Sequence, residues 1–372
     1  MLANFDPAHV VAALISVGIG MVITTQATFL AGMTAIMGNP LSASAISFTV
    51  GLGTLSMLVL GQYGRARHVG TLEPVRWAGV QWWELLGGPL GAMELTSRAF
   101  IAERIGLTPQ AVANITGQMI VSLYLDHIAF LGLPHKAITA RRIGGAFAVI
   151  GGCMVSAAEK MSASTSSVDV DEVSIVERLL LMALAVFAGS CLPVQAGVNR
   201  KLGERFPNCY SLRLPATLTS FFFGYLSLYS LLIIVQFGMG RDVLVNIPGS
   251  IHLVPWYQYI AGVIGILYVG GGVVLAPIIG VGGFMVSGVL GQLSLGIVLD
   301  AVGIEGRQKV PITFASVFGA LMVFVGALCI TLAPAKVLVG KPETGEVELQ
   351  GAYAEFDAEK PGAEGEDKDW VV

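Results

Sequence analysis

The stretch TGQMIVSLYLDHIAF, residues 116–130, returns in altered form as LGQLSLGIVLDAVGI at residues 290–304. Each copy sets a glutamine (Gln118, Gln292) and, eight residues later, an aspartate (Asp126, Asp300) in an apolar run. Polar side chains in such a run are costly unless they find partners or serve a function. The recurrence of the pair at one spacing therefore indicates two segments that occupy corresponding places in the fold.

The rest of the chain has the composition of a membrane protein. Apolar residues make up 54% of its 372 residues and charged residues 12%, with a mean hydropathy of +0.75. Soluble domains carry about 25% charged residues, and a membrane-spanning helix needs about 20 largely apolar residues. We therefore predict an all-α integral membrane protein with ten transmembrane helices, at residues 9–30, 41–61, 80–98, 107–126, 140–158, 178–198, 213–236, 256–276, 283–300 and 312–333.

The similarity between the two opening stretches extends over much of the chain. With a displacement of 174 residues and no gap, residues 82–157 match residues 256–331 at 18 of 76 positions. Upstream, at a slightly different displacement, Gln26 falls on Gln195. Because glycine, glutamine and aspartate match as well as aliphatic residues, shared apolarity does not explain the alignment. The sequence therefore predicts an internal duplication.

The duplication predicts both the domains and the topology. We expect a first five-helix repeat at residues 1–158, a polar linker at 159–177, a second five-helix repeat at 178–334 and an acidic disordered tail at 335–372. Since five is odd, the second repeat must enter the membrane inverted relative to the first. Inverted repeats are typical of secondary transporters, whose substrate site lies at the repeat interface near the membrane midplane.

Charged and reactive residues add an orientation and several exclusions. Twelve Lys and Arg residues on one side of the predicted spans against seven on the other place both termini in the cytosol. The four cysteines show no metal-ligand spacing, there is no Walker loop, and no nucleophile is paired with a base. We therefore expect no metal, no cofactor, no enzyme activity and no nucleic-acid partner. The expected partners are a small-molecule substrate and the lipid bilayer, and the oligomeric state stays open.

Four motifs resemble the YdcZ family of the drug/metabolite transporter (EamA-like) superfamily. They are WWELLGGPLGA (82–92), GQMIVSLYLDH (117–127), RRIGGAFAVIGG (141–152) and LPVQAGVNRKLG (192–203). The resemblance implies two fused five-helix units, inverted relative to each other, that transport small metabolites. The Q-x-x-x-N pattern of LPVQAGVNRKLG is Gln195 and Asn199, whereas the first half has Gln26 and Leu30. The second half is thus the better candidate for substrate contact.

Five amides form the predicted substrate-binding set. Gln118 and Gln292 fall near the middle of their spans and should point into the helix bundle, away from lipid. There they either hold helices together or line a substrate cavity. Gln195, Asn199 and Gln26 complete the set.

Three carboxylates are candidates for coupling or gating. Asp126 and Asp300 lie roughly 12 Å along the helix from their glutamines, hence at span ends, and inversion would send them to opposite membrane faces. They are either gates or interfacial carboxylates that meet nearby loops or basic residues, which for Asp126 are Arg141 or Arg142. Glu94 lies well inside a span, where it either couples transport to protons or is neutralised by Arg98 at i+4.

The sequence therefore predicts a secondary transporter of a small neutral or cationic organic molecule that works by alternating access. Proton coupling is an open alternative within that prediction. The rival hypothesis is a non-transporting membrane scaffold or receptor that docks partners through the acidic tail.

Overall fold

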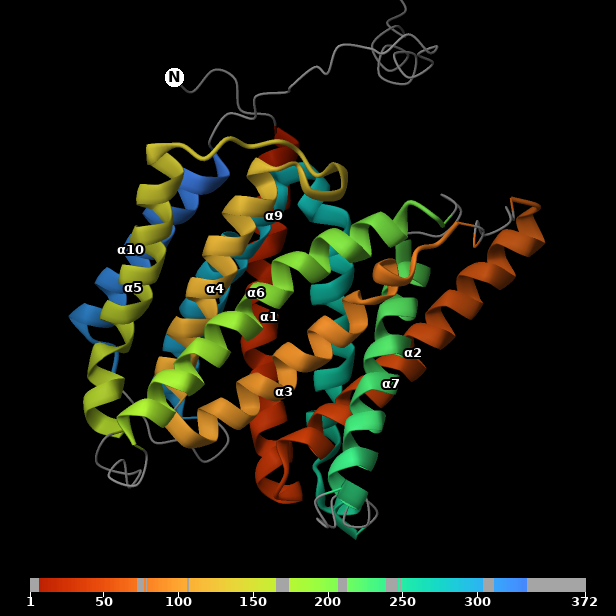
Figure 1. The fold of residues 1–372 in the computed structure, drawn as a ribbon, viewed down its shortest axis with the longest axis horizontal. Coiled ribbons are helices and arrows are strands. Elements are labelled where there is room, and N and C mark those ends of the chain that lie inside the picture. Colours follow the sequence, from red (N-terminus) through yellow and green to blue (C-terminus); the bar gives the residue numbers. More distant parts are fainter. Residues whose placement is uncertain are drawn as a thin grey trace, which may run out of the picture. The chain divides into compact units, whose positions relative to one another are not determined.

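The computed structural model describes residues 7–71, 77, 79–105, 107–164, 174–206, 213–238, 247, 249–303 and 311–332. Within these ranges the chain consists of helices and their connections (Figure 1). The predicted acidic tail, residues 335–372, lies outside them, as do residues 165–173 of the predicted linker.

Each predicted span overlaps a described helix, and the count of ten membrane spans stays a prediction. The α-helices among the described residues are α1 (Pro7–Met37), α2 (Pro40–Val69), α3 (Gly87–Ile105), α4 (Leu107–His127), α5 (Ala140–Ser164), α6 (Ile175–Gly203), α7 (Leu214–Gly238), α9 (Ile260–Val302) and α10 (Phe314–Thr331). Short 3-10 turns stand at η1 (Trp82–Leu85), η2 (Phe130–Gly132), η5 (Ile251–Leu253) and η6 (Trp256–Tyr259). Helix α9 contains two predicted spans, and α5 extends to Ser164, into the predicted linker.

Local sequence explains where the helices begin and end. The Asn39 side chain caps α2 by accepting a hydrogen bond from the Leu41 N–H at 2.8 Å, and Pro40 follows it at a position that needs no donor. The same helix ends on Gly70, which has φ of 75°, a left-handed conformation that glycine adopts without strain. Such signals lie within a few residues of the helix end, so they can be read from the chain alone.

Six of the described helices are long and apolar enough to cross a membrane: α1, α2, α6, α7, α9 with its preceding turn, and α10. Together they account for seven of the ten predicted spans. The remaining three spans correspond to α3, α4 and α5, which carry more polar and charged residues, Glu94 and Asp126 among them. The described part of the chain is therefore all-helical, with most of its helices apolar and long enough to cross a membrane.

Helix packing in one half has a counterpart in the other. Where α1 meets α9, a methyl group at Gly20 would come within 2.0 Å of the Gly288 carbonyl oxygen. Where α6 meets α4, a methyl group at Gly189 would come within 2.0 Å of the Asn114 carbonyl oxygen. Position 288 is the counterpart of position 114 at the displacement of 174 residues. The two crossings are thus equivalent, and each needs a glycine for the backbones to approach.

Two further helix pairs bring the halves together directly. Helices α5 and α10 lie side by side at one edge of the bundle and α2 and α7 at the other (Figure 1). Between α5 and α10, Gly152 packs on the Gly319 backbone, and the corresponding Gly326 packs on the Gly145 backbone. Between α2 and α7, the rings of the corresponding residues Phe48 and Phe221 pack at a tilt of 35° with centroids 5.1 Å apart. Each pair joins an element of the first half to its own counterpart.

Helix α9 is broken at Gly280, whose φ of 78° and ψ of 161° leave the helical region. This conformation is essentially restricted to glycine. The break separates the predicted spans 256–276 and 283–300, and it leaves unpaired carbonyl and N–H groups that need partners inside the protein.

Candidate functional site

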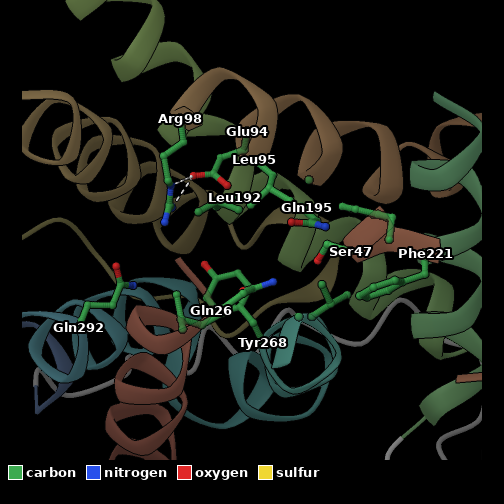
Figure 2. A pocket seen from close by; sticks show the side chains of 15 residues that line it. Gln26, Ser47, Glu94, Leu95, Arg98, Leu192, Gln195, Phe221, Tyr268 and Gln292 are labelled. Carbon is green, nitrogen blue, oxygen red and sulfur yellow. Dashed lines mark hydrogen bonds and ion pairs between the residues drawn. The ribbon is translucent and has the colours of Figure 1, made fainter. Parts of the chain in front are cut away.

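A pocket lies between the two halves of the chain, lined by side chains of α1, α2, α3, α6, α7 and α9 (Figure 2). Its empty volume, counted together with the open solvent at its mouth, is about 590 Å³. The polar residues that line it are Gln26, Ser47, Glu94, Arg98, Gln195, Tyr268 and Gln292. Four of the eight predicted site residues are thus brought together here.

Corresponding residues of the halves face the pocket from opposite sides. Gln26 on α1 lies over Gly265 of α9, where a methyl group would come within 3.0 Å of the amide nitrogen. Gln195 on α6 lies over Gly91 of α3, where the equivalent separation is 2.4 Å. Each glycine leaves room for the amide of the opposite half, so both amides extend into the space between the repeats (Figure 2).

Glu94 breaks this equivalence because its counterpart in the second half is Tyr268. The Glu94 side chain is buried, and it accepts hydrogen bonds from the Arg98 Nε at 2.9 Å and from the Arg98 Nη2. Asn114 Nδ2 also donates to Glu94, at 3.3 Å. In this structure Arg98 therefore balances the carboxylate, and both charged groups line the pocket (Figure 2).

Gln118 and Gln292, equivalent in sequence, have different surroundings. Gln118 is buried and donates to the Asn114 Oδ1 at 2.6 Å on its own helix, outside the pocket. The residue corresponding to Asn114 in the second half is Gly288, which offers no side-chain partner, and Gln292 lines the pocket. Asn114 was not among the predicted residues. Its signal in the sequence was the i, i+4 spacing from Gln118.

Asp126 is buried at the break in α9. Its Oδ1 accepts from the Val281 N–H at 2.8 Å, and its Oδ2 accepts from the Gly282 N–H at 3.2 Å and from the Arg142 Nη2 at 2.5 Å. The carboxylate therefore caps the helix that begins after Gly280, where a negative charge is favourable. Pairing with Arg142 was one sequence-based alternative. The carboxylate is fully buried at the end of α4, and its predicted place at a membrane face stays a prediction.

Two cations complete this cluster, which we call the hinge cluster (Asp126, Lys136, Arg142). Lys136 Nζ donates to the Ile279 carbonyl on the other side of the break, and Arg142 Nη1 donates to the Lys136 carbonyl at 2.8 Å. Burial lowers the pKa of Lys136 to about 8, against the opposing effect of Asp126. Sequence reasoning missed Lys136 because it lies in a loop, where a lysine is normally exposed. The Asp300 side chain lies outside the described residues.

Asn199 lies one helical turn beyond Gln195 on α6, outside the pocket lining. It packs against Gly87, where a methyl group would come within 1.9 Å of its Oδ1. The residue is 1% exposed, and neither its Oδ1 nor its Nδ2 forms a hydrogen bond within the described part of the chain. The structure therefore places Asn199 beside the site, on the contact between α6 and α3.

The described helices form two corresponding sets around a shared polar pocket, an arrangement known from membrane transporters. The sequence profile of the family described as "Putative inner membrane exporter, YdcZ" matches residues 11–155 and again residues 180–329. The chain therefore belongs to the YdcZ family of drug/metabolite transporters and carries two fused copies of its unit.

Comparisons with curated proteins and solved structures give information about the fold alone. No curated protein matches the chain. Among the solved structures that match, one described as "Crystal structure of protein" has a TM-score of 0.53 and 16% sequence identity, over 87% of this chain and 99% of that chain. At this identity the similarity concerns the course of the backbone and carries nothing about cargo.

Proposed function

We propose that the chain is a secondary transporter that moves a small neutral or cationic organic molecule by alternating access. Membership in an exporter family supports a transport role. The finer mechanism rests on ten membrane spans, five in each half, arranged as two inverted repeats with both termini in the cytosol. The equivalent glycine crossings of α1 with α9 and of α6 with α4 support this arrangement.

The observation that carries the proposal is the pocket between the halves. Inverted-repeat transporters bind cargo at the repeat interface, and here Gln26 and Gln195 approach one pocket from corresponding helices. Movement of one repeat against the other would change the surroundings of this pocket while its amides stay with their own helices. Alternating access requires this combination of a shared site and two movable walls.

The lining indicates the chemistry of the cargo. Gln26, Gln195 and Gln292 offer both donors and acceptors to a neutral polar molecule. Glu94 adds one carboxylate, which a cationic group or a proton could neutralise if Arg98 moved away. We therefore assign Glu94 the role of coupling acid, with cargo or protons competing with Arg98 for its charge.

Flux in reconstituted vesicles tests the proposal. Purified protein is assayed with a panel of labelled neutral and cationic metabolites, each with and without a proton gradient. Gln292→Ala should lower the flux of the transported compound by about fivefold, as expected for loss of one hydrogen bond of about 1 kcal/mol. Gln118→Ala is the matched control, because this equivalent amide lies outside the pocket. Equal flux in wild-type protein and Gln292→Ala would place the site elsewhere.

Deletion of residues 335–372 separates transport from the rival scaffold hypothesis. A transporter whose site lies between the repeats should keep its flux without the acidic tail. A scaffold should show no protein-dependent flux with any compound of the panel, and should lose its binding partner when the tail is removed.

A further inference from the structure

The contact between α3 and α6, here called the α3–α6 seam, pairs amides with glycines twice in succession. Gln195 lies over Gly91 in the pocket, and one helical turn further along both helices Asn199 lies over Gly87. The two helices run side by side in Figure 1. Because glycine and amide groups bury little apolar surface, separating this seam loses less hydrophobic stabilisation than separating an aliphatic one.

Asn199 is unsatisfied in the state that the structure describes. Both of its side-chain polar atoms are buried without a hydrogen-bond partner among the described residues. Buried polar groups in folded proteins are nearly always paired, and an unpaired one is destabilising. A buried amide that carries this penalty is expected to find its partner in another state of the protein or in a bound molecule.

An ion pair closes the end of the seam beyond Asn199. Glu84 in η1 precedes α3, and Arg205 follows the end of α6. Arg205 Nη2 donates to Glu84 Oε1 at 2.6 Å, and Arg205 Nε donates to Glu84 Oε2 at 3.1 Å. The Glu84 side chain is fully buried while that of Arg205 is 28% exposed, so the pair separates the interior of the seam from the surface.

The corresponding contact between α1 and α9 is apolar one helical turn beyond the pocket. Gln26 lies over Gly265, but the next positions along these helices are Leu30 and Ala261, both buried. Leu30 packs in an apolar cluster with Met33 and Met37. The two seams are thus equivalent at the pocket and differ one helical turn away from it.

We propose that the α3–α6 seam is an access path to the pocket, with Asn199 a second amide that contacts cargo along it and the Glu84–Arg205 ion pair its latch. The role of Asn199 in binding cargo rests on the proposed transport function, whereas the opening of the seam depends on the fold alone. When the latch opens and α3 separates from α6, Asn199 becomes accessible and its two polar atoms gain partners. The α1–α9 seam, closed by Leu30, stays apolar in that movement.

Accessibility of position 199 tests the path directly. Asn199→Cys is prepared in full-length protein from which Cys153, Cys191, Cys209 and Cys329 have been removed, and it is labelled with a membrane-impermeant maleimide. Adding Glu84→Gln should raise the labelling rate by at least about tenfold, because loss of a charge-assisted hydrogen bond shifts the equilibrium towards the open seam. Where Glu84→Gln does not fold, Arg205→Gln breaks the same latch.

Glu204→Gln is the matched control for this experiment. Glu204 pairs with Arg200 at 2.8 Å and Lys201 at 2.9 Å at the same end of α6, but these ion pairs do not bridge to α3. The Glu204→Gln variant should therefore leave the labelling rate at position 199 unchanged. In a second control, Glu84→Gln should not raise the labelling rate of Leu30→Cys. An unchanged rate at position 199 with the latch broken, or an equal rise with Glu204→Gln, would overturn the proposal.

Flux separates this inference from the proposed function. Asn199→Leu makes the α3–α6 seam resemble the seam that contains Leu30, and it removes two unpaired polar atoms. It should therefore keep or raise the melting temperature while lowering flux by about fivefold, the effect of one lost hydrogen bond. If wild-type protein shows no flux, the transport proposal fails while the labelling result still decides the path. If wild-type protein transports and Asn199→Leu transports at the same rate, contact between Asn199 and cargo is excluded, and the labelling result still decides the path.

Discussion

The two halves of the chain share a helical frame and differ in the charges placed on it. Both use glycine at the same crossings, as Gly20 and Gly189 show, and both present a glutamine to the pocket. Among the described residues, it is the first half that sets an ion pair beside the pocket, because Glu94 and Arg98 correspond to Tyr268 and Gly272 in the second.

The cations of the hinge cluster are likewise charged in the first half and replaced by uncharged residues in the second. The residues of the second half that correspond to Lys136 and Arg142 are Val310 and Ser316. Backbone approach between helices tolerates few residue types, so the glycines match in both copies. A side chain that faces the pocket or a helix break is free to differ once the frame is built. The comparison suggests that duplication provided the frame and that one copy then supplied the charges.

Loss of the hinge-cluster carboxylate should have the largest effect. Asp126→Asn leaves Lys136 and Arg142 buried without a counter-charge, and we expect a loss of about 3–5 kcal/mol in the free energy of unfolding. Chemical denaturation in detergent measures this loss. Asp300→Asn is the comparison, since the positions aligned with the two cations are Val310 and Ser316. Equal destabilisation by both variants would contradict the asymmetry.

Removal of the pocket carboxylate should come next. Glu94→Gln should lower the initial flux rate by about 30-fold or more, the equivalent of the roughly 2 kcal/mol or more expected for a buried charge partner. Tyr268→Phe should lower it only slightly, because the Tyr268 hydroxyl donates to the Met285 sulfur at 3.5 Å and to no charged group. Comparable losses in the two variants would show that the halves contribute equally.

Alanine substitutions of the glycines beneath the two pocket amides should have smaller effects on transport, and the two effects should differ in size. Gly91→Ala places a methyl group 2.4 Å from the Gln195 nitrogen, whereas Gly265→Ala places one 3.0 Å from the Gln26 nitrogen. The first variant should raise the KM for transport by about fivefold through loss of about one hydrogen bond, and the second by less. Concentration-dependent flux measures both. The reverse order would mean that Gln26 is the more important amide.

The latch should give the smallest effect on stability. Arg205 Nη2 donates to Glu84 Oε1 at 2.6 Å, and the Arg205 side chain is part-exposed. Glu84→Gln should therefore lower the free energy of unfolding by about 1 kcal/mol, well below the loss expected for Asp126→Asn. Chemical denaturation in detergent compares the two variants. Equal destabilisation by both would contradict this order.

The sequence by itself determined the helices and their duplication. Apolar runs, Pro40 at a helix start and Gly70 at a helix end act within a few residues, so the positions of the spans could be predicted from the chain. Matched glycines and glutamines at one displacement revealed the two copies, because close backbone crossings restrict which residues can stand there. It also indicated Glu94 and its neighbour Arg98, since a spacing of four residues brings side chains together on any helix.

Only the tertiary structure decided which polar residues face the pocket. Gln118 is engaged by Asn114 while the equivalent Gln292 is available, and this difference depends on one residue a helical turn away. Asp126 is buried with Lys136 because Gly280, more than a hundred residues later in the chain, brings a broken helix against them. Local patterns fix the backbone of each helix, but the partner of a polar side chain depends on which distant helix approaches it, and packing alone sets that approach.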